Sequence, residues 1–354
     1  MFYHVVEQDY RWSDWMETFF FACNAVLPII LLIFLGYYLR QKELYNDTFL
    51  KCGNKFVFQV ALPVLLFYNV YSIETIQDIR WSVIVFACGM SLVVFLVGVG
   101  VTMLFTKDDK KRGVLLQCIF RSNFAIIGIP LSESIGGSGG IKTASIISAF
   151  SIPLFNVLAV VALTMFQKDD CGKKISMKQV GKKIAQNPLI RGVLLGFVCL
   201  LTRRIIPKDD QTGQYIFTIQ NNLPFLYKAI KNVGAIASPF ALIVLGGNFK
   251  FCAVKRLWKE IIYGTAWRVI LTPFLAISSA LLLSGHTQIF HFTSAEYPAF
   301  IALFASPVAV ASAIMAGEMG GDEELAGQLV VWTSICSVFT IFVTIVILRN
   351  LGVI

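Results

Sequence analysis

The fold class is decided by the stretch between residues 114 and 135, which reads VLLQCIFRSNFAIIGIPLSESI. Apart from Arg121 and Glu133 it carries no charge, and a helix that crosses a bilayer needs roughly 20 apolar residues. Gly128 and Pro130 lie inside it, and proline lacks the backbone N–H and clashes with the preceding helical turn. The stretch therefore predicts a membrane-spanning helix that kinks or breaks near Gly128 and Pro130.

Nine further runs along the chain are likewise apolar, nearly free of charge and roughly long enough to cross a bilayer. They cover residues 19–39, 56–73, 81–106, 143–167, 187–202, 232–248, 261–284, 297–317 and 325–348, with Arg191 and Arg268 as their only charges. Only 14% of the 354 residues are charged and 56% are hydrophobic, whereas a soluble domain is roughly 25% charged. The composition excludes a soluble enzyme, a disordered chain and a fibrous protein. It predicts an all-α polytopic membrane protein with ten transmembrane helices.

Two patterns centred on proline recur between the halves of the chain. Ala61-Leu62-Pro63 returns as Ala237-Ser238-Pro239 after 176 residues, and Gly128-Ile129-Pro130 is matched by Ala305-Ser306-Pro307 after 177 residues. The offsets predict two five-helix repeats, residues 19–167 and 187–354, joined by a basic cytoplasmic linker, residues 168–186. Residues 1–18 would form an N-terminal extracellular segment.

An odd number of helices in each repeat turns the second copy upside down in the membrane, which is the plan of many secondary transporters. The fourth and ninth helices would then be broken, would cross near the midplane and would hold the substrate there. The alternative is that these prolines are ordinary kinks.

Lysine and arginine are concentrated in four loops, which favours a cytoplasmic position for those loops. The loops follow the runs that end at residues 39, 106, 167 and 248. We therefore expect a multi-pass protein of the plasma membrane with both termini on the non-cytoplasmic side. Five basic residues between residues 203 and 231 oppose this orientation. The net charge of +9 is thus a topology signal, and with no soluble domain to carry it, nucleic-acid binding is not expected.

The candidate substrate-binding residues gather around the two predicted breaks. A deep charge in a membrane helix is costly and points to function, so Arg121 is expected to hold a substrate carboxylate, unless it pairs with an acid or extends to the surface. Asn123 is expected to line the site. The other candidates are Gly128 and Pro130 at the first break, Ser306 and Pro307 at the second, and the polar residues Asn69 and Asn156 in or near the second and fifth apolar runs. Arg268 is expected to extend to the membrane surface, and Glu133 is a candidate for carrying a coupling proton.

Motifs of catalysis and energy coupling are missing from the sequence. It has no Walker A loop, no HExxH, no nucleophile elbow and no CxxC pair. We therefore expect no enzymatic activity, no cofactor and no metal site, and any transport would be driven by a gradient or be passive.

Four motifs resemble the auxin efflux carrier family. The stretch from Arg121 to Leu131 is similar to its fourth helix and the stretch from Ala61 to Phe67 to its second. Ala305-Ser-Pro-Val-Ala309 with Gly317-Glu-Met-Gly320 resembles the ninth helix, and Thr333-Ser-Ile-Cys-Ser337 the start of the last. The resemblance covers residues 19–348. It implies two inverted five-helix repeats with crossing fourth and ninth helices, elevator-like alternating access and a homodimer. Bacterial members are similar to malate and malonate permeases.

The sequence thus favours a secondary active transporter for a small organic anion, most simply a carboxylate, with the lipid bilayer as its surroundings. A sodium-coupled symporter of the bile-acid type is the near alternative, although no Asp or Glu lies in the predicted crossing. A membrane receptor that does not transport is a second alternative, and a membrane enzyme is a third.

Overall fold

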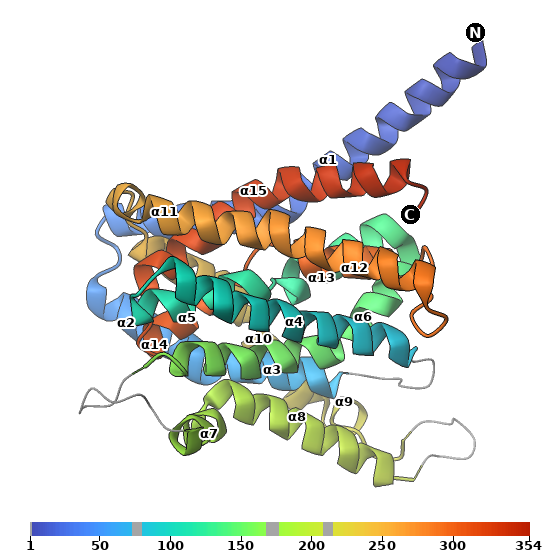
Figure 1. Cartoon of the computed structure of the whole chain (residues 1–354). Helices are drawn as coiled ribbons and strands as arrows, with labels where there is room; N and C mark the ends of the chain where they lie inside the picture. The colour runs from blue at the N-terminus through green and yellow to red at the C-terminus, as the bar shows by residue number, and fades with distance from the viewer. Residues whose placement is uncertain (1, 73–79, 168–176, 208–214) are drawn as a thin grey trace.

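The computed structural model describes residues 2–72, 80–167, 177–207 and 215–354. The regular secondary structure of these residues is helical. The one exception among them is an isolated antiparallel bridge between Ser122 and Val308. The elements, in which η marks a π-helical turn, are α1 (Phe2–Gln41), α2 (Asp47–Phe56), η1 (Val57–Ala61), α3 (Leu62–Tyr71), α4 (Trp81–Phe105), α5 (Asp109–Phe120), η2 (Phe124–Gly128), α6 (Ile129–Thr164), α7 (Met177–Gln186), α8 (Pro188–Ile205), α9 (Ile219–Asn222), α10 (Pro224–Asn248), α11 (Cys252–Ala266), η3 (Trp267–Leu271), α12 (Thr272–His286), α13 (Tyr297–Ala305), α14 (Ala311–Glu318) and α15 (Glu323–Asn350) (Figure 1).

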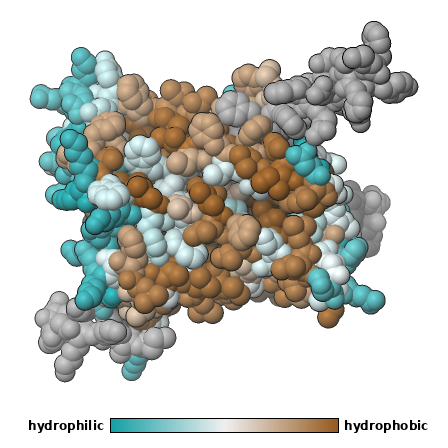
Figure 2. Space-filling view, turned by 45° about the horizontal axis from the view of Figure 1, so that its top comes forward, coloured by the Kyte–Doolittle hydropathy of each residue, from teal (hydrophilic) through white to brown (hydrophobic). Residues whose placement is uncertain are grey.

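Several helices are long and apolar enough to cross a bilayer. In the described part of the chain there are six, Asp47–Tyr71, Trp81–Phe105, Phe124–Thr164, Pro224–Asn248, Cys252–His286 and Glu323–Asn350. A seventh results if Lys178–Gln186 and Pro188–Arg203, which meet at a bend of 67°, count as one. Figure 2 shows apolar side chains over the middle of one face and polar ones at its two edges. The protein is therefore an all-α, polytopic membrane protein.

The remaining apolar runs of the sequence also lie in helices. Residues 19–39 belong to α1, and residues 297–317 are divided between α13 and α14. The end of the run at residues 114–135 and the run at residues 143–167 are joined without a loop in α6. Inside this helix Gly137 departs from helical geometry, with φ 55° and ψ −141°. A positive φ is open to glycine because it has no Cβ, so this residue lets the chain change direction inside α6.

The helices pack in two groups. In the first, α1 packs on α10, and α3 packs on α8 and α10; in the second, α4, α5, α6, α11, α12, α13, α14 and α15 pack on one another. Glycine allows the tightest contact of the first group, because a Cβ on Gly36 would lie 2.0 Å from the carbonyl oxygen of Ile243 and one on Gly246 would lie 1.9 Å from that of Ile33. Small residues that bring backbones together are typical of helix pairs in membranes. The two groups meet where α1 contacts α15 and α6, where α3 and α8 contact α6, and where α10 contacts α14 and α15.

Three prolines follow π-helical turns. Pro63, Pro130 and Pro273 each stand two residues after the end of η1, η2 or η3. A π-turn widens the helix locally, which accommodates a proline that has no N–H to donate and whose ring needs room. The spans that carry these prolines therefore stay helical through them.

The first break was predicted at the wrong residues. The helix does not break at Gly128 and Pro130; α5 ends at Phe120, and the chain is non-helical from Arg121 to Asn123 before η2 begins. The reason is the π-turn, which absorbs Pro130. The second break lies where Pro307 predicts it, since α13 ends at Ala305 and α14 begins at Ala311.

Candidate functional site

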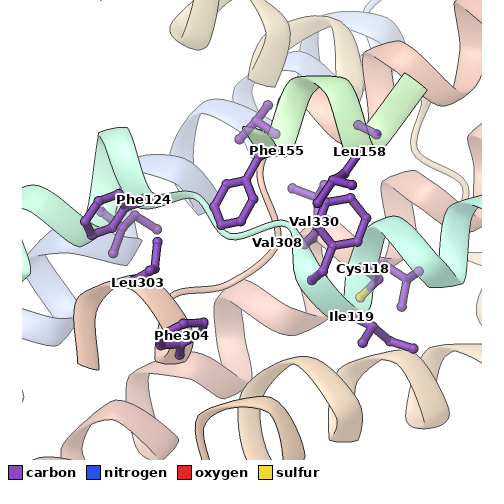
Figure 3. Close-up of a cluster of buried hydrophobic side chains, with 14 of the residues drawn as sticks. Cys118, Ile119, Phe124, Phe155, Leu158, Leu303, Phe304, Val308 and Val330 are labelled. Atoms are coloured by element: carbon purple, nitrogen blue, oxygen red, sulfur yellow. The ribbon is translucent and has the colours of Figure 1, made fainter. Parts of the chain in front are cut away.

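The two non-helical segments pair with each other. The backbone N–H of Asn123 donates to the carbonyl oxygen of Pro307 at 2.8 Å, and the N–H of Ala309 donates to that of Arg121 at 3.2 Å. This gives the antiparallel bridge between Ser122 and Val308. Figure 3 shows the apolar side chains around this crossing, with Phe124 and Leu303 on one side and Cys118 and Val308 on the other. We call residues 121–123 and 306–310 the crossover.

Arg121 lies at the crossover and is only 4% exposed. Its guanidinium contacts Oε1 of Gln117 at 3.3 Å, Oδ1 of Asn156 at 2.8 Å and Sδ of Met315 at 2.8 Å. All of these partners, taken from the described residues, are neutral. A buried charge is costly unless an opposite charge or several hydrogen bonds compensate it. The site thus holds a positive charge whose natural complement is an anion.

A cavity of about 80 Å³ opens beside Arg121, between the two helix groups. Its crossover side is formed by residues 121–126 and 309–311, and its opposite side by α3, α8 and α10 through Leu62, Leu65, Leu66, Asn69, Leu189, Ser238 and Ala241; Ile152, Phe155 and Asn156 of α6 complete it. Within the described part of the chain, no Asp or Glu belongs to this lining. The cavity is therefore mainly apolar, with one positive charge and several neutral polar groups.

Two helix N-termini face this cavity. Phe124 begins η2, which continues into α6, and Ala311 begins α14; both line the cavity. The first N–H groups of a helix have no acceptor in the helix, and they carry a partial positive charge that favours anions. The Nδ2 of Asn123 and the Oγ of Ser122 are also buried and lack a hydrogen-bond partner among the described residues. The cavity therefore offers donors and positive potential together.

The structure brings together half of the residues that the sequence nominates. Arg121, Asn123, Asn156 and Asn69 line the one cavity. Of the other four, Ser306 and Pro307 belong to the crossover, whereas Gly128 ends η2 and Pro130 lies in the first turn of α6, and none of the four lines the cavity.

Three of these four residues make contacts at the crossover or beside it. A Cβ on Gly128 would lie 2.9 Å from the carbonyl oxygen of Ala302, so this glycine lets η2 approach α13. Pro130 is exposed on the surface of the chain. The carbonyl of Pro307 accepts from Asn123, and that of Ser306 accepts from Arg268.

Arg268 was wrongly expected to extend to the membrane surface. It is fully buried in η3, and its guanidinium donates to four backbone carbonyls, those of Ile119 (3.1 Å), Leu303 (3.3 Å), Phe304 (2.5 Å) and Ser306 (2.9 Å). These carbonyls belong to the last turns of α5 and α13 and to the break that follows α13. The signal was in the sequence, because Arg268 is the single charge of its apolar run. Gln117, Ser122 and Met315 were also missed.

Comparison with known proteins agrees with this architecture. Residues 21–345 match the family described as "Membrane transport protein". The chain is 24% identical over 299 residues to the uncharacterized transporter YfdV of Escherichia coli strain K12. The matched residues cover 80% of this chain and 87% of that protein. It is 22% identical over 262 residues to the uncharacterized transporter MJ1031 of Methanocaldococcus jannaschii, covering 72% and 76%. The chain is therefore a membrane transporter and belongs to the membrane transport protein family, the auxin efflux carrier family that its four motifs resemble.

Proposed function

We propose that the chain is a secondary active transporter, a permease or efflux carrier, for a small organic anion and most simply a carboxylate. The observation that carries this proposal is the guanidinium of Arg121, which is buried beside a cavity and whose partners among the described residues are all neutral. A guanidinium matches a carboxylate with two parallel hydrogen bonds. The N-termini of η2 and α14 add positive potential on the same side.

Ten membrane crossings in two inverted repeats are part of the proposal. The matched proline patterns support it, and so do the broken helices α5–η2 and α13–α14, which occupy corresponding places in residues 19–167 and 187–354. Broken helices at matching positions are the usual mark of a midplane binding site in secondary transporters. The basic linker and the N-terminal segment would lie on opposite sides of the plasma membrane, with both termini outside.

Alternating access is supported by the place of the cavity. Its lining comes from both helix groups, with Leu65 and Asn69 on α3 facing Arg121 and Asn123 of the crossover. A movement of one group past the other would expose such a boundary site first to one side and then to the other. The first group would also provide the surface for a homodimer.

The nature of the cavity favours an anion carrier over the alternatives. A bile-acid-type sodium symporter would be expected to place acidic ligands for the cation at the crossing, and no carboxylate of the described residues lines this cavity. Glu133, the candidate for a coupling proton, is exposed and lies outside the lining, so proton coupling would use another path. Uptake of the anion into proteoliposomes would separate a carrier from a receptor that binds it without transport.

A thermal-shift screen of the purified protein tests the proposal, because a ligand that binds only the folded state raises the unfolding temperature. The panel holds monocarboxylates, dicarboxylates, indole acids, amino acids and organic amines. We expect a saturable rise with at least one carboxylate, and none with it in the Arg121→Gln variant. A rise with amines alone would contradict an anion site.

A further inference from the structure

The C-terminal ends of the two broken helices come together on a single side chain. The last turns of α5 and α13 both point their carbonyl groups at Arg268, which contacts Ile119 from α5 and Leu303, Phe304 and Ser306 from α13 and its break. Thr272, one turn further along, also donates to the carbonyl of Ile119 at 3.1 Å. Carbonyls at helix ends carry partial negative charge, so two negative ends converge here.

Converging carbonyls of this kind attract a cation. In transporters with broken helices, the unwound carbonyls and the C-terminal helix ends are where a coupling cation such as Na⁺ is held, while the N-terminal ends face an anionic substrate. In this chain the N-terminal ends of η2 and α14 face the cavity, and the C-terminal ends face Arg268. A guanidinium of the chain itself thus lies where the carbonyls of the two helix ends converge.

Arg268 suits this position by both charge and shape. It is fully buried, and its partners among the described residues are neutral oxygens and no carboxylate. The planar guanidinium spreads its donors over a fork, and this fork reaches carbonyls of two helices that are far apart in sequence. A metal ion could leave such a site, whereas a tethered cation cannot.

We propose that Arg268 is a tethered cation in place of a coupling cation: it neutralises the C-terminal ends of both broken helices, positions the crossover and makes anion binding independent of sodium. The inference rests on the proposed function only for its last part. The role of Arg268 at the two helix ends stands on geometry and can be tested without any substrate.

Chemical rescue tests the proposal. The purified Arg268→Ala variant is heated with millimolar guanidinium chloride, with urea, its neutral counterpart of similar shape, or with choline chloride. We expect the variant to unfold at a lower temperature than the wild type, and guanidinium to raise that temperature saturably. The matched control is Arg256→Ala, which removes an exposed arginine paired with Glu324 and should show no rescue. Rescue by urea equal to that by guanidinium would overturn the role of charge.

Two conservative variants keep the test decisive if Arg268→Ala does not fold. Arg268→Lys retains the charge and Arg268→Gln retains only hydrogen bonding, so we expect the lysine variant to unfold at the higher temperature. An equal or reversed order would overturn the proposal.

A comparison of sodium chloride with choline chloride tests whether anion binding is independent of sodium, which is the part of the inference that depends on the proposed function. The unfolding temperature of the wild type should be the same in sodium chloride and in choline chloride at equal ionic strength, with and without a carboxylate found by the thermal-shift screen. A rise specific to sodium would show that a metal ion binds as well, and would overturn sodium independence. If no carboxylate binds, the proposed function fails while the rescue experiment still decides the role of Arg268.

Discussion

The Nη2 of Arg121 lies 2.8 Å from the Oδ1 of Asn156, and this hydrogen bond joins the crossover to α6. Asn156 is held in turn, since its Nδ2 donates to the carbonyl of Ile152 at 2.8 Å. The amide oxygen is therefore aimed at the guanidinium. The guanidinium also contacts Gln117 and Met315, and none of these neutral partners offsets its positive charge, which is therefore left for a ligand.

Replacing Asn156 by aspartate should place a carboxylate of the protein itself against Arg121, in competition with an anionic ligand. The Asn156→Asp carboxylate would sit where Oδ1 already contacts Arg121, and a buried arginine pairs strongly with a carboxylate. We expect carboxylate affinity to fall by at least about 10-fold, since a hydrogen bond to a charged group contributes roughly 1.5–3 kcal/mol. Isothermal titration of the detergent-solubilised protein measures the change.

The Asn156→Leu variant is the control for this substitution, because it removes the amide and adds no charge. It should weaken binding less than Asn156→Asp does. If both variants lose the same affinity, Asn156 shapes the cavity and the charge of Arg121 is not what the anion recognises.

Gly128 should tolerate no side chain. A Cβ there would lie 2.9 Å from the carbonyl oxygen of Ala302 and closer still to the ring of Phe124, so Gly128→Ala would push η2 away from α13. Overpacking of this kind costs about 1–3 kcal/mol, which lowers the unfolding temperature. Gly100→Ala is the matched control, because a Cβ at this helical position meets no atom within 4 Å. It should be neutral or stabilising, and equal losses in both variants would contradict the close contact.

Glu323 links the two helix groups at one end of the bundle. Its Oε1 accepts from Nδ2 of Asn54 at 2.9 Å and from Nδ2 of Asn248 at 3.1 Å, so α15 is joined to α2 and α10. Glu323→Ala would leave the buried amide of Asn54 without its partner, at a cost of about 1–3 kcal/mol. A lower unfolding temperature in this variant, measured by the fluorescence of the tryptophans, is the expected result. Glu324→Ala, at the exposed ion pair with Arg256, should change it little.

The sequence predicts the membrane class and one of the two breaks, because these depend on local properties. Apolar runs of spanning length lie in helices whatever their partners, and Pro307 ends α13 by its own chemistry. The sequence also nominates Arg121, because it is a charge inside an apolar run. That it lies beside Asn123, Asn156 and Asn69 in one cavity required the fold.

The remaining features depend on contacts between distant residues. The break from Arg121 to Asn123 contains no proline or glycine, and it is held open by pairing with Pro307 and Ala309. Pro130 causes no break because η2 accommodates it. The carbonyls that Arg268 contacts are free to accept because α5 and α13 both end beside it. One of them, the carbonyl of Ile119, is 149 positions away in sequence. Single-residue rules cannot foresee such partners.

The proposed anion site is tested most directly by uptake of a carboxylate into proteoliposomes that contain either the wild type or Arg121→Gln. Glutamine keeps hydrogen-bonding groups near Gln117 and Asn156 but removes the charge. Truncating one partner of a buried, hydrogen-bonded charge pair costs about 2–5 kcal/mol. We therefore predict saturable uptake by the wild type, with a loss of at least about 30-fold in kcat/KM in Arg121→Gln while the variant still unfolds cooperatively. Equal uptake by the two proteins would contradict the account.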